Sequence, residues 1–374
     1  MSNTSNLKVT FAAIDPYLTT NIVSPKEVNL KGKDRVQWGE KNAYPEYLLD
    51  LFKSVPTLRS IITGSADFVA GDDVTSSRPL NLRNDLPREV VHNLGLDFFL
   101  YGGFALQVIR DKKGDVAEIY YCDIRFLRTD KDNEVFYYSE KWTEGGRDAI
   151  VYPKFYPYKA EQWSKLTPEE KARNASSIYY YKDTHTQAYP SPCWAAAVKA
   201  CEQERGIDDY HLNALENGFT SSMLVNFNQG VPSDEIKNEI ERSFTEKFTG
   251  HQNAGRVMFS WNDSKDTMTT MQSVKVEDFG ERYNSLAKHA RQQIFTAFRA
   301  VPALFGLMNE TTGFSEQEFA EAFKLYNRTR IKPVQRNITE AVEKIFGESV
   351  IEITPFEVEV NKSNAPVAEE KPVE

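Results

Sequence analysis

Two long helical segments on either side of a shorter mixed segment constrain the fold of this chain more than any other feature. Residues 276–299 predict one helix, because apolar side chains recur along it at steps of 4, 3, 4, 4 and 3 residues. The residues of this stripe are Phe279, Tyr283, Leu286, Ala290, Ile294 and Ala297. Residues 194–217 predict a second helix, roughly 36 Å long at about 1.5 Å per residue. Long rods with a single apolar face are typical of helices that pack side by side around an axis.

The segment between these two helices predicts a small α/β unit. Short apolar runs at 223–227 and 257–261 predict two strands. Between them, Pro232 and Ser233 open a helix that Gly250 ends. One face of that helix carries a stripe at i, i+4 spacing, which we expect to form the packing surface of the unit: Ile236, Ile240, Phe244 and Phe248.

The part of the chain before residue 194 predicts a mixed body. Apolar residues at helical spacing predict helices over 44–71, interrupted by Pro56, and over 87–100, with a loop at 72–86 between them. Residues 101–160 alternate apolar and polar side chains, which predicts an antiparallel meander. A further strand is expected at 177–182, and residues 1–35 are polar enough to predict an arm or a peripheral strand outside the core.

The remainder of the chain predicts a loop, a third helix, a strand and a tail. Pro302 stops the second long helix, and residues 304–313 form the loop. A capping box at Ser315 opens the third helix, which is expected to kink at Pro333 on its way to Phe346. The last two segments are a strand at 350–360 and a disordered tail at 361–374.

Charge and cysteine content argue against several functional classes. The formal net charge is −9, from 45 Lys and Arg against 54 Asp and Glu, so bulk charge does not hold nucleic acid, although one face could touch DNA. Wide spacing of Cys122, Cys193 and Cys201 argues against a disulfide framework or a cysteine zinc site, and favours a reducing cytoplasm. The N-terminus lacks the pattern of a secretory signal, and the longest apolar stretch, 94–109, is too polar to span a membrane.

A search for catalytic motifs finds nothing that specifies an active site. Gly250 and Gly255 have the glycine spacing of a phosphate-binding loop, but Arg256 and Val257 stand where that loop needs Lys and then Ser or Thr. No two of the five histidines have metal-ligand spacing, and no GxSxG sequence occurs. The sequence therefore predicts no catalytic residue, no metal site and no cofactor, which favours a structural role.

Two basic stretches lie on the predicted long helices. Acidic residues are missing from 282–299 of the second long helix and from 322–339 of the third. These stretches form a solvated face, a face that makes ion pairs with a neighbouring subunit, or a surface that meets phosphates without reading sequence. The candidate residues are Arg282, Lys288, Arg291, Arg299, Lys324 and Arg328.

From Trp38 onward, and most clearly from Tyr101 to Phe346, the chain resembles the portal proteins of tailed double-stranded DNA bacteriophages. Five segments resemble landmarks of that family, in the family's order. They are YGGFALQVIRDKKGDVAEIYY, with Gly103 in place of the usual Asn; YPSP at 189–192, without the family's glycine; LENGFTSSMLVNF; SDEIKNEIERSFTEKFTGHQNAGRVMF; and RQQIFTAFRAVPALFGLMNETTGFSEQEFAEAF. Pro333 also matches a proline of the family. No single segment is specific, but their order and spacing together are.

This resemblance implies an α+β fold, the portal fold, with an α/β wing, two long stem helices that flank a small α/β clip, a tunnel loop and a short helical crown. The implied regions are an N-terminal arm at 1–37, the wing at 38–193, stem helix 1 at 194–218, the clip at 219–275, stem helix 2 at 276–301, the tunnel loop at 302–314, the wing and crown helix and strand at 315–360, and the tail at 361–374. The residues that would project into the tunnel are Leu307, Met308, Asn309, Glu310, Thr311, Thr312 and Gly313.

The resemblance also implies a function without chemistry of its own. Such a chain is not an enzyme but forms a ring, usually of twelve copies, at one vertex of a capsid, as the channel for DNA packaging and ejection. The implied partners are further copies of the chain, double-stranded DNA held non-specifically, the terminase large subunit, the head–tail adaptor, the major capsid protein and scaffold, with no membrane. The implied location is the virion, and the host cytoplasm during assembly. An acidic chain suits a channel in which DNA slides, because each phosphate contact adds affinity.

Two alternatives stay open at this point. One is another virion component, such as a head–tail adaptor or a minor capsid protein, whose ring could have the same symmetry but whose chain does not need the helix–insert–helix order. The other is an enzyme that acts on DNA, such as a nuclease or a motor subunit. The missing phosphate-binding loop and metal cluster argue against that second alternative.

Overall fold

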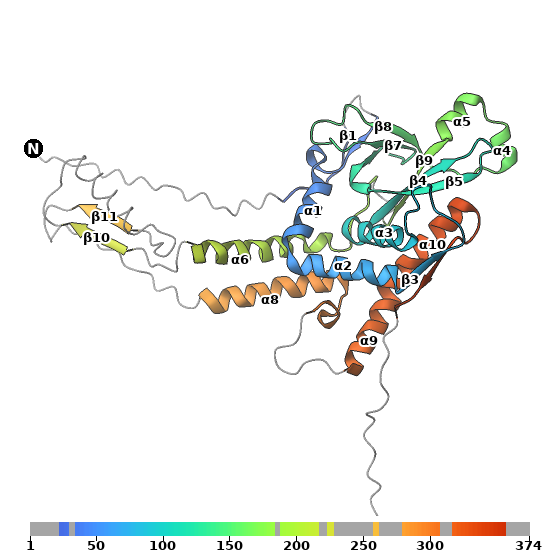
Figure 1. The fold of residues 1–374 in the computed structure, drawn as a ribbon. Helices are drawn as coiled ribbons and strands as arrows, with labels where there is room; N and C mark the ends of the chain where they lie inside the picture. Colours follow the sequence, from blue (N-terminus) through green and yellow to red (C-terminus); the bar gives the residue numbers. More distant parts are fainter. Residues whose placement is uncertain are drawn as a thin grey trace, which may run out of the picture.

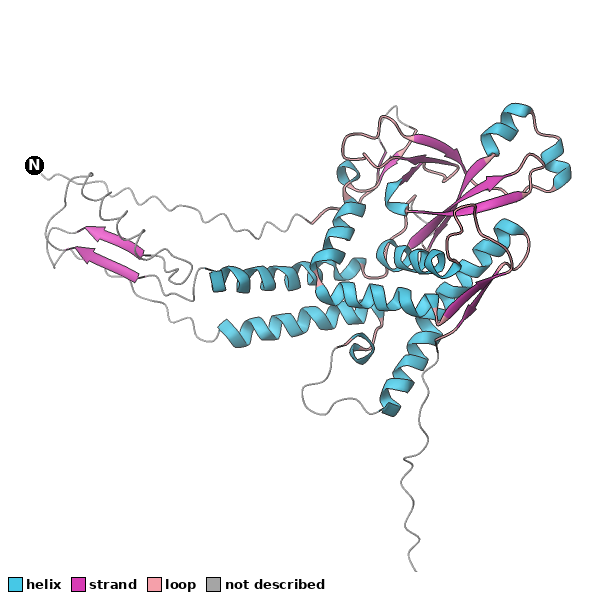
Figure 2. Ribbon diagram, viewed as in Figure 1, coloured by secondary structure: helices cyan, strands magenta, loops and turns pink. Residues whose placement is uncertain are grey.

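A computed structural model of the protein describes residues 22–29, 34–183, 188–216, 223–227, 257–261, 279–306 and 316–356. A body of helices and small sheets carries two long helices, α6 (Val198–Glu216) and α8 (Phe279–Phe298), which project from it together (Figure 1). The two larger sheets lie on the side of the body away from this pair, with helices between (Figure 2). The described chain therefore mixes helix and sheet, as the sequence predicts, and the tail predicted at 361–374 lies outside it.

The centre of the body is a layer of three helices: α1 (Tyr44–Ser54), α2 (Pro56–Ala70) and α3 (Pro87–Tyr101). Pro56 separates α1 from α2, as predicted, because proline is tolerated in the first turn of a helix but not in its interior. α2 and α3 pack along each other, and their buried faces supply much of the main hydrophobic core.

The first three-stranded sheet packs on this layer. Its strands run in the order β5 (Val116–Cys122), β4 (Gly103–Arg110) and β9 (Ser176–Lys182), with antiparallel neighbours. Successive side chains of a strand point to opposite faces. Phe104, Leu106 and Val108 of β4 therefore enter the main core, whereas Gln107 and Ile109 belong to the outer face of the sheet.

A pair of glycines joins α3 to β4 where no side chain would fit. Gly102 ends α3 with a φ of 87°, and a Cβ at this position would lie 2.4 Å from the carbonyl oxygen of Ser191. A Cβ at Gly103 would lie 2.4 Å from the carbonyl oxygen of Tyr181 in β9. The YGGF segment is therefore a close crossing of α3, β9 and the chain that leads to α6.

The sequence predicts one antiparallel meander over 101–160, and this prediction is wrong. The strands of this region belong to two sheets, because β6 (Leu127–Thr129), β7 (Val135–Tyr138) and β8 (Ile150–Pro153) form, in that order, a second three-stranded sheet. A 3₁₀ turn at Ile124–Phe126 separates it from β5, and the Asp123 side chain caps that turn by accepting from the Arg125 amide. At this turn the chain passes onto the outer face of the first sheet. The second edge of β4 therefore pairs with β9 and not with β6.

Residues 72–86, which the sequence predicts to be a loop, contain the strand β3 (Asp73–Ser76). Its antiparallel partner is β12 (Ile351–Thr354), which falls within the strand predicted at 350–360. A strand this short gives little local signal, because the hydrogen bonds that define it come from a segment far away in the sequence.

The third long helix is interrupted before Pro333, and not only bent there. It consists of α9 (Glu316–Tyr326), a π-helical turn (Asn327–Ile331) and α10 (Lys332–Phe346). Proline lacks the N–H that would bond the carbonyl four residues earlier, and its ring crowds that carbonyl. The helix widens by one π turn directly before the proline at which the sequence predicts a kink.

The two strands predicted between the long helices are confirmed with the predicted bounds. β10 (Met223–Phe227) and β11 (Val257–Trp261) pair in parallel, and Figure 1 places them beyond the far ends of α6 and α8. Parallel strands need a crossover of at least about a dozen residues, and residues 228–256 supply that length. The helix predicted there lies outside the described residues, with its stripe of Ile236, Ile240, Phe244 and Phe248.

The chain joins the core slightly before the end of the arm predicted at 1–37. β1 (Val28–Asn29) pairs antiparallel with β2 (Val36–Gln37). Val36 is buried, and the ring of Trp38 stacks on Tyr189 with 4.7 Å between ring centroids. The short elements not yet named are α4 (Ala160–Ser164), α5 (Pro168–Asn174) and 3₁₀ turns at Glu40–Asn42, Ala195–Ala197 and Pro302–Phe305. None of the helices in the described part of the chain is both long and apolar enough to cross a membrane.

Asp97 of α3 is a carboxyl group buried inside the body. It accepts hydrogen bonds from the Tyr121 hydroxyl at 3.1 Å and from the Ile124 amide at 3.3 Å. Burial, and then the nearby carboxylate of Asp123, raise the pKa of Asp97 well above its ordinary 3.8. The folded protein therefore holds a proton at Asp97 over a pH range in which the unfolded chain has released it.

Replacing Asp97 by asparagine is expected to flatten the pH dependence of stability. Between pH 3.8 and the raised pKa, unfolding releases the proton, so the free energy of unfolding falls as the pH rises. Asp97→Asn removes this proton and keeps an oxygen acceptor. Thermal unfolding midpoints measured from about pH 5 to about pH 8 should fall less in the variant than in the wild type. The exposed Asp148→Asn is the matched control and should keep the wild-type slope; equal slopes for all three proteins would contradict the assignment.

Candidate functional site at the base of the long helix pair

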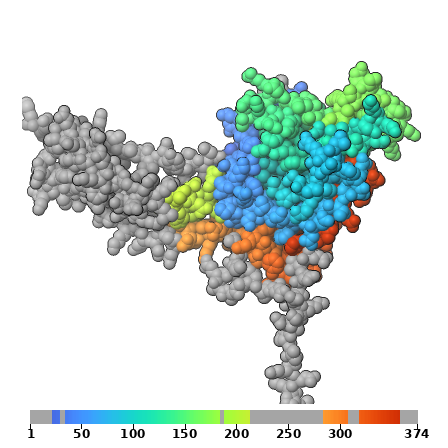
Figure 3. Space-filling view, in the orientation of Figure 1, coloured from blue at the N-terminus to red at the C-terminus, as the bar shows by residue number. Residues whose placement is uncertain are grey.

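The two long helices leave the body side by side. They pack on each other, and Figure 3 shows their surfaces emerging together beside the blue surface of the N-terminal helices. Near the body, Ala290 and Ile294 of the predicted stripe are buried, together with Phe295 and Phe298. The predicted apolar stripe on 276–299 is therefore a buried packing surface in the half of α8 that lies against the body.

The far half of the helix pair leaves apolar side chains uncovered. Tyr283 of α8 stacks on Tyr210 of α6, with 4.7 Å between ring centroids. Leu286, a member of the predicted stripe, is 50% exposed, and Leu212 of α6 is 57% exposed. Within one copy of the chain these leucines face water, which costs free energy that a neighbouring copy could recover by covering them.

A buried carboxylate joins the helix pair to the body. Glu204 of α6 is 2% exposed and accepts a hydrogen bond from the Thr57 hydroxyl of α2 at 2.7 Å. Its Oε1 atom also lies 3.3 Å from Nε of Arg291 in α8. Its Oε2 atom is buried and has no hydrogen-bond partner in the described part of the chain. One carboxylate thus ties α6 to both α2 and α8.

A second buried acid binds α6 to α1. Glu202 accepts a hydrogen bond from the Tyr47 hydroxyl at 2.7 Å and pairs with Arg205 at 2.6 Å. The Arg205 guanidinium also forms an ion pair with Asp50 of α1 at 2.8 Å. Burial, and then the hydrogen bond to Glu202, raise the pKa of Tyr47. Together the two acids fix the base of α6 on α1, α2 and α8 through polar contacts whose geometry is directional.

Both flanks of the predicted tunnel loop are anchored on α2. The Ser60 hydroxyl donates to the carbonyl oxygen of Phe305 at 3.0 Å, just before the loop. After the loop, the Tyr326 hydroxyl of α9 lies 2.8 Å from the Ser65 hydroxyl. The loop residues themselves lie outside the described residues: Leu307, Met308, Asn309, Glu310, Thr311, Thr312 and Gly313.

The structure places the predicted basic residues on α8, directly after it, on α9 and in the π turn. Of these residues, Arg291 meets Glu204 inside the chain, so its guanidinium already has an acidic partner. The exposed members are Lys288 on α8, Arg299 in the turn directly after α8, Lys324 on α9 and Arg328 in the π turn. Arg282 lies in α8, with its side chain outside the described residues. Within the described ranges, no group of three or more His, Cys, Asp or Glu side chains is placed to hold a metal ion.

Sequence reasoning missed Glu202, Glu204 and their partners. A signal for Glu204 was present, because it follows the buried Ala197 and Cys201 on the same helical face. An acid in an apolar row must find polar partners when it is buried. Nothing local identifies those partners, since Thr57 lies 147 residues away in the sequence.

Comparison with known proteins points to one family. A family model described as phage portal protein matches residues 82–365, which is more than half of the chain. An uncharacterized protein of Rickettsia felis is 26% identical over 201 residues, covering 51% of this chain and 49% of that protein. One of Rickettsia bellii is 25% identical over 207 residues, covering 52% and 51%. The chain thus spans about half the length of the curated relatives it matches.

Solved structures share the fold at low sequence identity. A chain in the virion of the native gene transfer agent particle has a TM-score of 0.54 at 18% identity, over 89% of this chain and 86% of that one. The neck of the native particle, computed with C12 symmetry, gives 0.51 at 17%, over 86% of each chain. An HK97 family phage portal protein from Corynebacterium diphtheriae gives 0.50 at 12%, over 82% and 94%.

Proposed function

Because the chain belongs to the phage portal protein family, we propose that it forms a ring at one vertex of a capsid, as the channel for packaging and ejection of double-stranded DNA. The family match carries this proposal, and the projecting pair α6 and α8 supports it, because such a pair can line an axis shared by several copies. Portal proteins are structural proteins, and we propose that this chain likewise acts without catalysis or a cofactor.

We propose a ring of twelve copies. The neck structure with a similar chain was computed with C12 symmetry. The exposed Leu212 and Leu286 on the helix pair support side-by-side packing of neighbouring copies, because burying them would remove apolar surface from water. Paired with Glu204, Arg291 would hold the helix pair in place, whereas the exposed Lys288 and Arg299 would serve as DNA guides or as ion-pair partners between copies.

The regions of a portal map onto the chain as follows in this proposal. The stem is formed by α6 and α8, and the clip is the segment between them, which includes the parallel strands β10 and β11. The body before α6 is the wing, and α9, α10 and β12 complete the wing and crown. The tunnel loop follows α8, held at both flanks by α2.

The proposed partners follow from this role. They are the terminase large subunit during packaging, a head–tail adaptor afterwards, the major capsid protein and scaffold around the wing, and DNA in the channel. The proposed location is the virion, after assembly in the host cytoplasm. The net charge of −9 suits a channel that does not retain DNA, because each phosphate contact adds affinity.

A charge on the exposed side of the stem is expected to prevent ring formation without unfolding the chain. Leu286→Glu would bury an unpaired carboxylate between neighbouring copies, at a cost of several kcal/mol per interface. Leu286 is half exposed in the single chain, so the thermal midpoint of dissociated protein should stay close to wild type. Leu82→Glu, at a side chain that is 83% exposed in the loop before α3, is the matched control. Negative-stain images of rings at wild-type yield from Leu286→Glu would show that this face is not an interface.

A further inference from the structure

A row of basic side chains on the third helix takes no part in the contacts proposed for the ring. It follows the exposed face of α9, the π turn and α10 at a spacing of four residues, and we call it the basic row. Its members, all exposed, are Lys324, Arg328, Lys332 and Arg336. The nearest acids along the helix, Glu321 and Glu340, lie beyond its two ends. The third helix therefore presents a line of positive charge to its surroundings.

The π turn keeps the basic row on one line. In a regular α-helix, residues four apart drift around the axis by about 40° at each step, so a longer row spirals off one face. A π turn closes its hydrogen bonds over five residues and holds more residues per turn, which rotates the following residues back. The π turn at Asn327–Ile331 lies in the middle of the row. The four cations are thereby aligned over roughly 18 Å, at about 1.5 Å per residue.

The basic row has no ion-pair partner among the described residues. The ion pairs between described residues involve none of its four side chains. Like charges four residues apart on a helix repel each other and destabilise it. An anionic segment beside the row would remove this repulsion, so the row is a binding surface for an acidic partner.

The described chain ends beside the first member of the basic row. The ring of Phe356 packs on Phe323 of α9, with 5.6 Å between ring centroids, and on Phe68 of α2 at 5.8 Å. Lys324 directly follows Phe323 on α9. The residues after Phe356 therefore begin against the helix that carries the row, one residue from Lys324.

We propose that residues 357–370 of the same chain bind along the basic row. This segment contains four carboxylates against one cation, Lys362. The carboxylates are those of Glu357, Glu359, Glu369 and Glu370. Their charge complements that of the row, and the contact of Phe356 with α9 fixes where the segment begins. Charge and position thus favour the same occupant.

The length of the segment suits this path. The two glutamates that closely follow Phe356 meet the near end of the row, at Lys324 and Arg328. The remaining residues, 360–370, can span up to roughly 36 Å when extended, at about 3.3 Å per residue. The second pair of glutamates can therefore reach the far end of the row, which lies about 18 Å from its start.

An apolar side chain beside the row adds to the fit. Leu325, directly after Lys324, is 61% exposed. Val358 and Val360 alternate with the first two glutamates of the segment. A segment that passes Leu325 covers it with these valines, which removes apolar surface from water.

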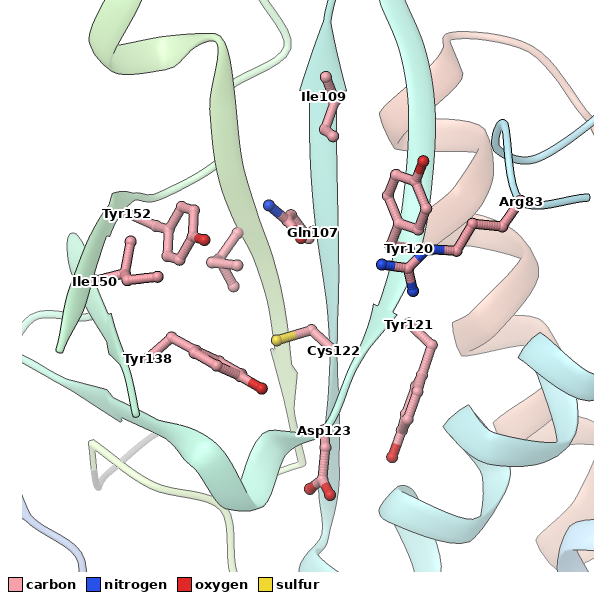
Figure 4. A pocket seen from close by; sticks show the side chains of 11 residues that line it. Arg83, Gln107, Ile109, Tyr120, Tyr121, Cys122, Asp123, Tyr138, Ile150 and Tyr152 are labelled. Carbon is pink, nitrogen blue, oxygen red and sulfur yellow. The ribbon is translucent and has the colours of Figure 1, made fainter. Parts of the chain in front are cut away.

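Two other pairings are less complementary. The N-terminal residues 1–21 contain one cation and one anion, Lys8 and Asp15, so they bring no net charge to the row. A groove of about 440 Å³ between the two three-stranded sheets is a second place for the segment (Figure 4). Its lining contains one cation and one anion, Arg83 and Asp123, so it offers no net charge to the four glutamates.

Binding along the row is expected to depend on salt. Exposed ion pairs are individually weak, and dissolved salt screens them. The covalent link to Phe356 gives the segment a high effective concentration at the row, which offsets this weakness. We therefore expect the segment to be bound at low ionic strength and released at about 1 M salt.

Zero-length cross-linking of the full-length chain tests the proposal, and it needs no ring. A carbodiimide joins an amine to a carboxylate that it contacts. At low salt we expect Lys324 and Lys332 to be linked to glutamates of residues 357–370, as seen by peptide mass. Lys112 and Lys113, exposed in the turn after β4, are the matched control and should form at least about tenfold fewer links to the segment.

Two further controls make the cross-linking decisive. The exposed ion pair of Lys154 and Glu134, at 2.8 Å, should be linked in the same sample and shows that the chemistry works. Mixing isotope-labelled and unlabelled chains distinguishes links within one chain from links between chains.

Two outcomes of the cross-linking would overturn the proposal. One is an equal yield of links from the row lysines and from the control lysines. The other is links found only between chains, which would assign the row to a neighbouring copy's segment. Rings that form without links inside a chain would reject this inference alone and leave the portal assignment intact.

Protease protection covers the case in which cross-linking fails. A protease that cuts after glutamate should cut residues 357–370 slowly while they are bound. Arg328→Gln with Arg336→Gln should speed this cleavage severalfold at low salt and leave it unchanged at about 1 M salt. The exposed pair Arg147→Gln with Arg173→Gln is the matched control and should keep the wild-type rate. Equal rates in the wild type and the row variant at low salt would also overturn the proposal.

Discussion

Arg128→Met is expected to lower the free energy of unfolding of the body by about 3–5 kcal/mol. Arg128 of β6 is 1% exposed and donates from all three guanidinium nitrogens. It bonds Asn42 twice, through Oδ1 at 2.9 Å and the carbonyl oxygen at 3.1 Å. Its other bonds reach the carbonyl oxygens of Arg125 at 2.8 Å and Leu127 at 2.7 Å. Methionine fills a similar volume and leaves all these buried acceptors without this donor.

The aromatic surroundings of Arg128 add to this expected loss. Its guanidinium lies 4.9 Å from the ring centroid of Trp142 and 5.8 Å from that of Trp38. Burial lowers the pKa of Arg128 to about 10, so the group stays charged at neutral pH and keeps its attraction to both rings. Asn42, with a φ of 61°, also accepts from the Trp38 amide at 3.0 Å. Arg128 therefore holds the turn through which the N-terminal segment enters α1.

Urea unfolding followed by tryptophan fluorescence measures this effect, because both tryptophans contact Arg128. The exposed Arg147→Met is the matched control and should shift stability by no more than about 0.5 kcal/mol. A loss below about 1 kcal/mol in Arg128→Met would mean that water replaces the guanidinium at its acceptors.

Glu204→Ala is expected to loosen the base of the long helix pair. It removes the acceptor of Thr57 and the partner of Arg291, and it leaves a cavity between α2, α6 and α8. The half-exposed Arg291 can turn to water, so we expect a cost of about 2 kcal/mol, less than for a fully buried pair. That cost corresponds to roughly thirtyfold more frequent local opening.

Native-state hydrogen exchange measures this opening element by element. Amides of α6 and α8 near the body should exchange roughly thirtyfold faster in Glu204→Ala, while those of α10 keep their wild-type rates. The exposed neighbour Gln203→Ala is the control on the same helix. Glu204→Gln keeps the shape and an oxygen acceptor, and should exchange at rates between those of the wild type and the alanine variant. Uniform acceleration over the whole body would contradict a local role at this junction.

Local patterns predicted the elements whose signals are local. The strands at 223–227 and 257–261 have the predicted bounds, and Pro56 divides two helices as proline chemistry requires. The pairing of these two strands in parallel was not predicted, because direction depends on the length and path of the connection between them and not on either strand.

What sequence reasoning missed depends on partners far away in the chain. β3 exists because β12 pairs with it, and the division of residues 101–160 into two sheets follows from β9 taking the edge of β4. Glu204 could be seen as an acid on an apolar helical face, and Arg128 directly follows Phe126 and Leu127, but Asn42 and Thr57 could not be named as their partners. Of the predicted site residues, those at the base of the helix pair could be placed, whereas the clip stripe and the tunnel loop stay predictions.

The mass and shape of the purified protein test the central claim most directly. We would measure both on one sample, by mass photometry and cryo-electron microscopy, over a range of protein concentrations and with and without co-expressed scaffold. The portal assignment predicts closed rings of about 514 kDa, which is twelve times the 42.8 kDa of one chain, with a central channel and the α6–α8 pairs of neighbouring copies packed around it. Particles that stay monomeric under every one of these conditions, or that close without an axial channel, would contradict it.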